Sequence, residues 1–153
     1  MKIKISEARE LLNALITITS GNHTVVTKAG NGDKVSTQVP YTLDDKARWN
    51  LTKNLGLAER LVKDADKARE GIIRELSGGS GNISREENPG VYQQAVERIS
   101  ALENNSESAP FVRVKVSGLK ISADNPVPGI LVSTLRPILE EDIPVDASEV
   151  IPD

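Results

Sequence analysis

The side chains that could perform acid–base or nucleophilic chemistry are scattered along this 153-residue chain and match no catalytic motif. His23 is the single histidine and cysteine is absent, so the chain offers no second imidazole for a metal and no thiolate nucleophile. We expect His23, which follows Asn22, to be a surface turn residue. No serine lies in a nucleophile elbow. The sequence thus predicts no catalytic residue, no metal ligand and no cofactor site, and a protein that is not an enzyme.

Acidic residues stand together at three places, 44–45, 86–87 and 140–142, where two carboxylates could in principle share acid–base work. The first two sites precede expected helices, where carboxylates stabilise the positive end of the helix dipole. Asp64 and Asp66 approach the spacing of a calcium loop, but an alanine takes the next ligand position and an arginine the glycine position. Helix capping and solubility therefore explain these carboxylates better than catalysis.

Charge and composition exclude two further classes of ligand. Nineteen basic and 22 acidic residues give a net charge of −3, which provides no field for a polyanion, and nucleic acid is not the expected main ligand. The glycine-rich run 78–82 lacks the preceding strand and the lysine of a phosphate loop. No stretch approaches the roughly 20 apolar residues of a membrane span, and no signal peptide is evident at the start. We expect a protein without membrane contact that stays in the cytoplasm of its maker.

The elements that would position these residues begin with a helix over about 6–18, capped by Ser6 and apolar on one face. Two β-branched runs flank an Asn-Gly turn and predict a β-hairpin over about 24–39. A long helix over about 44–76, capped by Asp44 or Thr42, follows. Its apolar seam comprises Leu51, Leu55, Ala58, Val62, Ala65, Ile72 and Leu76. Gly56 within this helix indicates the close approach of another backbone.

A second helix over about 89–103, starting at Pro89, is expected to fold back on the long helix. The alternating run 111–116 predicts a strand that pairs with the β-hairpin, and a short helix follows over about 128–136. We therefore expect a single α+β domain over 1–140: a long antiparallel helical hairpin with an N-terminal helix, a small antiparallel β-sheet and a short C-terminal helix. The remaining segment, 141–153, is an acidic tail or an arm that becomes ordered on a neighbour.

Six residues are candidates for an interface with another protein: Trp49, Leu51, Leu55, Val62, Arg113 and Lys115. Trp often dominates binding, although we expect Trp49 to pack under the hairpin of its own chain rather than to anchor an interface. The seam of the long helix could supply apolar area to an assembly. Arg113 and Lys115 project from one face of their strand and could meet an acidic arm of a neighbouring subunit, or simply face solvent.

The order and spacing of several short motifs resemble a widespread family of small, functionally uncharacterised tailed-bacteriophage proteins. The resemblance covers most of residues 1–141 but not the insert around 22–38 or the acidic tail. The matching segments are Ala8–Leu15, Val39–Leu55 with its Lys53-Asn54 pair, Lys67-Ala68-Arg69-Glu70-Gly71-Ile72-Ile73, Val112–Val116, Gly118–Ser122 and Leu131–Glu140. This resemblance implies a phage origin and no particular activity.

Together these observations favour a virion-associated structural or assembly protein of a bacteriophage, which acts through protein–protein contacts. Its partners would be further copies of itself, as a homo-oligomer, and other phage structural proteins; it would be found in the virion or the host cytoplasm. The alternative is a phage accessory protein that inhibits a host factor or sequesters a small-molecule signal, with Arg48, Lys53, Arg113 and Lys115 converging on a nucleotide-like ligand.

Overall fold

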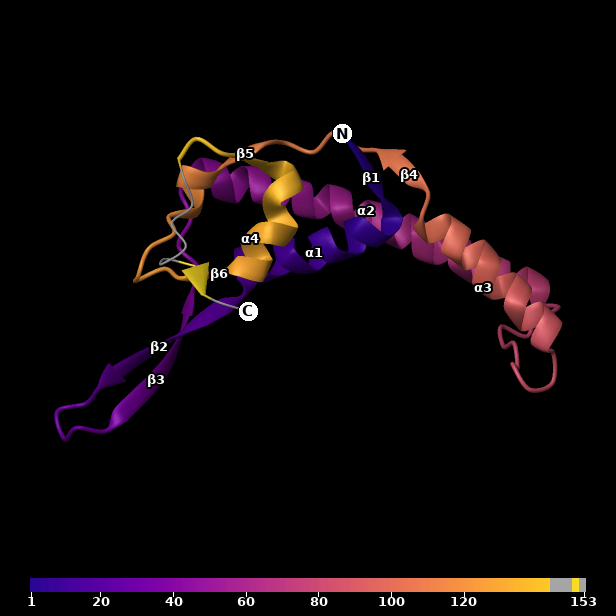
Figure 1. The fold of residues 1–153 in the computed structure, drawn as a ribbon, viewed down its shortest axis with the longest axis horizontal. Helices are drawn as coiled ribbons and strands as arrows, with labels where there is room; N and C mark the ends of the chain where they lie inside the picture. The colour runs from indigo at the N-terminus through magenta and orange to yellow at the C-terminus, as the bar shows by residue number, and fades with distance from the viewer. Residues whose placement is uncertain (144–149, 152–153) are drawn as a thin grey trace. The chain divides into compact units, whose positions relative to one another are not determined.

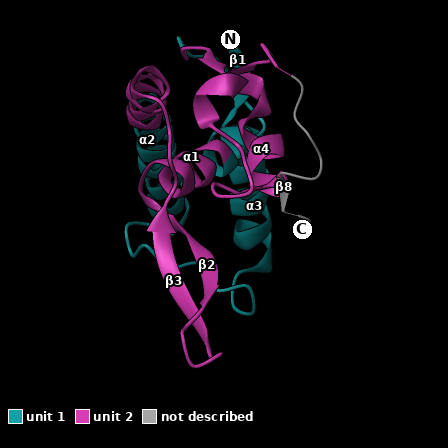
Figure 2. Cartoon of the chain, turned by 90° about the vertical axis from the view of Figure 1, so that its left-hand side faces the viewer, with its two compact units in different colours: residues 1–10, 57–110 teal, residues 11–56, 111–153 magenta. Residues whose placement is uncertain are grey.

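The computed structural model describes residues 1–143 and 150–151 and confirms the α+β class. The chain divides into two compact units, where the sequence predicts one domain (Figure 2). The first unit comprises Met1–Glu10 and Leu57–Pro110, and the second comprises Leu11–Gly56 and Phe111–Asp153. Two of the boundaries fall inside helices α1 and α2, and the third falls in the irregular segment between β4 and β5.

Helices carry most of the described chain (Figure 1). The α-helices are α1 (Ile5–Ser20), α2 (Asp45–Leu76), α3 (Pro89–Glu103) and α4 (Gly129–Leu135), and two 3₁₀ turns are η1 (Val116–Leu119) and η2 (Arg136–Ile138). The strands are β1 (Lys2–Lys4), β2 (Asn22–Lys28), β3 (Lys34–Pro40), β4 (Ser106–Ser108), β5 (Val114–Lys115), β6 (Val127–Pro128), β7 (Leu139–Glu140) and β8 (Val150–Ile151).

In the first unit, α3 returns alongside the second half of α2 as the expected antiparallel helical hairpin. The glycine-rich segment joins the two helices, and Gly78 and Gly79 adopt the positive φ angles that end α2. Arg98 of α3 and Glu75 of α2 form an ion pair of 3.1 Å. After α3, β4 pairs antiparallel with β1 and so ties the N-terminus into the unit.

Arg9 of α1 links three segments of the first unit through charged hydrogen bonds. Its Nε donates to both carboxylate oxygens of Glu103 at 2.9 and 3.0 Å, and its Nη2 donates to Asp66 at 2.7 Å. The hydrogen bonds to Glu103 and then to Asp66 raise the pKa of Arg9 above its ordinary value. A raised pKa favours the folded state at every pH below the arginine range, so this contribution is fully present near neutrality.

In the second unit, two buried asparagines hold segments of irregular backbone in place, Asn54 from a helix and Asn125 from a loop. Asn54 of α2 is fully buried; its Nδ2 donates to the carbonyl of Val112 and its Oδ1 accepts from the Val112 N–H, both at 2.8 Å. Asn125 closes the same kind of bidentate contact on Thr42, again at 2.8 Å on each side, and also donates to the carbonyls of Leu119 and Lys120. Each side-chain amide thus supplies the hydrogen-bond donor and acceptor that the irregular backbone residue would otherwise lack.

The β-structure of the second unit differs from the expected small antiparallel sheet in its pairing. The predicted strand over 111–116 is reduced to β5, because the chain turns into η1 at Val116. This strand pairs in parallel with β7, so the expectation that it joins the hairpin is wrong. The strands β2 and β3 pair only with each other among the described residues, over seven residue pairs. A second parallel pair joins β6 to β8.

Candidate functional site

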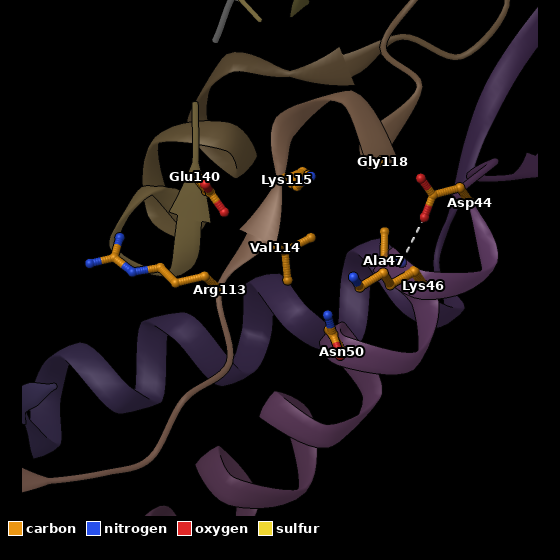
Figure 3. Close-up of a pocket in the computed structure, with 9 residues that line it drawn as sticks. All are labelled: Asp44, Lys46, Ala47, Asn50, Arg113, Val114, Lys115, Gly118 and Glu140. Atoms are coloured by element: carbon orange, nitrogen blue, oxygen red, sulfur yellow. Dashed lines mark hydrogen bonds between the residues drawn. The ribbon is translucent and has the colours of Figure 1, made fainter. Parts of the chain in front are cut away.

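A cavity of about 110 Å³ lies in the second unit, at the start of α2 (Figure 3). Three backbone segments form it: the first turns of α2, β5 with η1, and β7. Its walls are Asp44, Lys46, Ala47, Asn50, Arg113, Val114, Lys115, Gly118 and Glu140. The lining thus combines three cationic residues with two carboxylates and the apolar side chains of Val114 and Ala47, although the Arg113 guanidinium points away from the others in Figure 3. The sequence predicts Arg113 and Lys115 as site residues here, but neither Lys46 nor Asn50.

The start of α2 is fixed by Asp44 and Gly118. The Oδ1 atom of Asp44 accepts from the N–H of Ala47 at 2.7 Å, which makes Asp44 the N-cap of the helix. The Asp44 N–H donates to the carbonyl of Gly118 at 2.9 Å. A Cβ at Gly118 would lie 2.7 Å from the Cβ of Ala47, so only glycine permits this approach.

Asn50 supplies an uncommitted amide to the cavity. The residue is 9% exposed, and no hydrogen bond engages its side chain within the described part of the chain. Figure 3 shows the amide of Asn50 pointing from α2 toward Val114 of β5. Among the described residues only the His23 ring nitrogens are both buried and unpartnered, so the Asn50 amide remains accessible to water.

The cations of the cavity also lack carboxylate partners. Lys46, Arg113 and Lys115 are exposed, and none forms an ion pair with a described carboxylate. Arg113 instead donates from Nη1 to the carbonyl of Leu139 at 3.3 Å, which ties its strand to β7. Glu140, the neighbour of Leu139 in β7, leaves its own carboxylate facing the cavity in Figure 3.

The start of the acidic tail folds back on its own unit. Asp142 accepts hydrogen bonds from the hydroxyl and, at 2.9 Å, the N–H of Ser117. These bonds, with a smaller contribution from Lys115, lower the pKa of Asp142. Arg136 pairs with Glu141 at 2.8 Å. Thus the first tail residues contact their own chain, while 144–149 and 152–153 lie outside the described residues.

The six interface candidates fall into different environments. Leu51 is fully buried and so belongs to the core, whereas Leu55 and Val62 are half-buried. Trp49 is 64% exposed, and the expectation that it packs under its own hairpin is wrong. The Lys53 ammonium lies over the Trp49 ring, 5.3 Å from its centroid.

The four cations expected to converge on a ligand do not all meet. Arg113 and Lys115 share the cavity. Arg48 donates to the carbonyls of Thr19 and Tyr41, and Lys53 lies over Trp49.

The β2–β3 hairpin is a second candidate site, because most of it is exposed (Figure 2). Residues that face each other across the two strands share one side, and one side carries His23, Val39, Val25, Thr37, Thr27 and Val35. The base of this side is covered, since His23 is 6% exposed; toward the tip, Val35 is 45% exposed. The opposite side is polar apart from Val26.

His23 is not the surface turn residue that the sequence predicts. It lies in β2 with its ring tilted against Tyr41, at a centroid distance of 5.3 Å. Neither ring nitrogen has a hydrogen-bond partner among the described residues. Burial also raises the pKa of Tyr41 above its ordinary value. The pair is apolar packing at the base of the hairpin, without an acid–base partner.

The helical hairpin holds a wider groove of about 330 Å³, which is mainly apolar. Ile73 of α2 and Val96 and Ile99 of α3 face each other across it, and Tyr92 and Arg69 stand at its edge. Val96 and Tyr92 remain 40% and 36% exposed. The groove adds apolar surface to the first unit but contains no cluster of polar side chains that would orient a ligand.

Within the described ranges, no group of three metal-ligating side chains gathers, and no helix has the length and apolar character needed to cross a bilayer. Comparisons with family models, curated proteins and solved structures find no match to the chain. The candidate sites are therefore the small cavity beside α2 and the exposed β2–β3 hairpin, each defined by its own geometry.

Proposed function

We propose that the chain is a virion-associated structural or assembly protein of a bacteriophage, and that it acts through contacts with further copies of itself and with other phage structural proteins. The observation that carries this proposal is the β2–β3 hairpin. A two-stranded hairpin is marginally stable in water unless other structure covers one of its faces. Here seven residue pairs form with the apolar side uncovered toward the tip, where Val35 is 45% exposed; on the opposite side Val26 is 58% exposed.

The charge of the hairpin tip supports a protein partner. Lys28 and Lys34 stand directly opposite each other in the last pair of the ladder. Like charges in that position destabilise an isolated pair of strands, and carboxylates of a partner would offset the repulsion. Asp33 in the turn is held instead by Asn31, whose Nδ2 donates to it at 2.9 Å.

Two substitutions on opposite sides of the hairpin test the proposal. Val35→Glu places a charge on the apolar side, and Ser36→Glu places the same charge on the polar side, one residue away. Light scattering and native mass spectrometry of the purified chain should show an oligomer for the wild type and for Ser36→Glu, and a smaller species for Val35→Glu. An unchanged oligomer in Val35→Glu would contradict the role of the hairpin.

The virion itself provides the second test. Mass spectrometry of purified phage particles should detect the chain at a constant ratio to other structural proteins, and its absence from particles would reject the virion assignment. The alternative, sequestration of a nucleotide-like signal, gains no support from the cavity, since 110 Å³ is well below the roughly 300–1,000 Å³ of sites for such ligands.

A further inference from the structure

We propose that the groove between α2 and α3 binds an amphipathic helix of a different protein, and that carboxylates flank the apolar side of that helix. The groove lies wholly within the first unit, so the inference does not rest on the β2–β3 hairpin of the second unit. Three features support it: an apolar helix side that is incompletely buried, a hollow with helical spacing along one wall, and arginines at the groove that lack carboxylate partners.

The first feature is the incomplete burial of α3. Among its 15 residues, all within the described part of the chain, Ala95 alone is buried. Val91, Ile99 and Leu102 are half-buried, and Val96 is exposed. An amphipathic helix stabilises a fold by burying its apolar side against other elements, and here that burial is only partial. A further helix laid against α3 would complete it.

The second feature is the shape of the groove. Ile73 lines it from α2, and four residues of α3 line it at the spacing of one helix face: Tyr92, Ala95, Val96 and Ile99. Ala95 stands among larger side chains, so its short side chain leaves room for a side chain of a partner. Amphipathic helices dock into apolar grooves through anchors spaced i, i+3 or i+4 and i+7. The groove wall therefore matches a helical occupant.

The third feature is charge. Arg69 is the one charged residue among the described residues that line the groove, and the Arg85 guanidinium lies over the Tyr92 ring, 5.9 Å from its centroid. Neither arginine forms an ion pair with a described carboxylate. Carboxylates that flank the apolar anchors of a partner helix would pair with both arginines. The complementary occupant is therefore acidic as well as apolar.

The same charges argue against a second copy of the chain in the groove. Two copies that pair through identical surfaces place the same residues near each other on both sides. Such pairing would bring the arginines of two grooves together, while no carboxylate lines either groove among the described residues. Like charges across an interface oppose association. An acidic helix of different sequence avoids this repulsion.

The test is fluorescence anisotropy of a labelled peptide titrated with the full chain. The peptide has about 18 residues, enough to form a helix, with leucines three and four residues apart, glutamates on both sides of them and alanine elsewhere. A matched peptide carries lysine in place of each glutamate. The glutamate peptide should bind saturably and at least about tenfold more tightly than the lysine peptide. Equal affinities, or no saturable binding of the glutamate peptide, would overturn the proposal.

Variants locate the binding. Val96→Glu places a carboxylate at an exposed position in the groove and should abolish binding, whereas Gln94→Glu places the same charge on α3 outside it and should not. Arg69→Gln should weaken the glutamate peptide about tenfold; Arg74→Gln, exposed on α2 outside the groove, should leave its affinity unchanged. Wild-type affinity in Val96→Glu or Arg69→Gln would contradict the site. Val35→Glu should bind the peptide normally, which separates this test from that of the hairpin.

Two further results would reassign the occupant. If a peptide with the sequence of residues 140–153 binds more tightly than the glutamate peptide, the acidic segment of this chain is the better ligand. If light scattering shows a smaller oligomer for Val96→Glu than for Gln94→Glu, a second copy occupies the groove. Either result overturns the assignment to a different protein.

Discussion

Asn54 stands in the middle of a helix, where an amide side chain contributes little by itself, and yet it is among the most completely buried residues of the chain. Its two hydrogen bonds to Val112 explain this position. The Asn54 amide presents one donor and one acceptor in the spacing of a peptide group and so holds an extended segment against α2. Asn54 therefore has a structural role in the second unit.

Replacing Asn54 with alanine should lower the free energy of unfolding by about 2–4 kcal/mol, because the Val112 N–H and carbonyl would lose their partners beside a new void. Asn54→Asp should also destabilise, since a carboxylate cannot donate to the Val112 carbonyl. Urea unfolding measures both. Asn13→Ala, on the exposed side of α1, is the control and should change the stability by less than about 0.5 kcal/mol. Equal effects at the two positions would contradict the bidentate role of Asn54.

At His23, in contrast to Asn54, removing the polar atoms is expected to raise the free energy of unfolding. Its two ring nitrogens are buried without partners among the described residues, while the ring packs on Tyr41. His23→Phe keeps an aromatic ring and removes both polar atoms, and it should raise the free energy of unfolding by about 1 kcal/mol. His23→Ala should lower it, because the packing is lost. A destabilising His23→Phe would show that the imidazole has a hydrogen-bonding role.

Single residues of the cavity were only partly predictable from the sequence. Arg113 and Lys115 share a strand face by simple alternation, so their common environment follows from the pattern. Asn50 and Lys46 carry no such signal, because their role depends on β5 lying against α2. A hint exists in the helical spacing of Ala47, Asn50 and Asn54, which places two asparagines in line with a buried alanine.

At the scale of elements, the helices and the β2–β3 hairpin followed local rules, whereas the pairing of the strand expected over 111–116 did not. The helices expected over 44–76 and 89–103 are found as α2 (Asp45–Leu76) and α3 (Pro89–Glu103). Their ends were predictable because a cap, a proline and a terminal glycine run mark them in the sequence. The strand expected over 111–116 pairs with β7, far along the chain. Which strands meet depends on the tertiary fold, and periodicity alone does not contain that information.

Two glycines show the same contrast and can be tested as a pair. Gly56 in α2 lies in open space, so the expectation of a close backbone approach there is wrong; Gly118 in η1 has the close approach instead. Gly118→Ala should cost about 1–3 kcal/mol by pushing η1 from Ala47 and the Asp44 cap. Gly56→Ala should stabilise by about 0.5–1 kcal/mol through helix propensity. Calorimetry decides, and a neutral Gly118→Ala would contradict the packing described here.

At the scale of the whole molecule, the forces that favour association are apolar and those that oppose it are electrostatic. The chain carries a net charge of −3, so copies repel one another, whereas the hairpin and the α2–α3 groove expose apolar side chains. Contacts between copies are therefore expected where apolar side chains are exposed, and the hairpin is the site that we propose.

This balance predicts how self-association responds to salt. Raising the sodium chloride concentration from about 0.05 to 0.5 M shortens the Debye length and screens the repulsion between chains, while burial of Val35 on the apolar side of the hairpin is not weakened. The oligomer seen by light scattering should persist or grow at high salt, and Val35→Glu should remain smaller than Ser36→Glu at both concentrations. If the wild-type oligomer instead dissociates with salt, ion pairs such as those available to Lys28 and Lys34 hold it together, and the apolar side of the hairpin is not the interface.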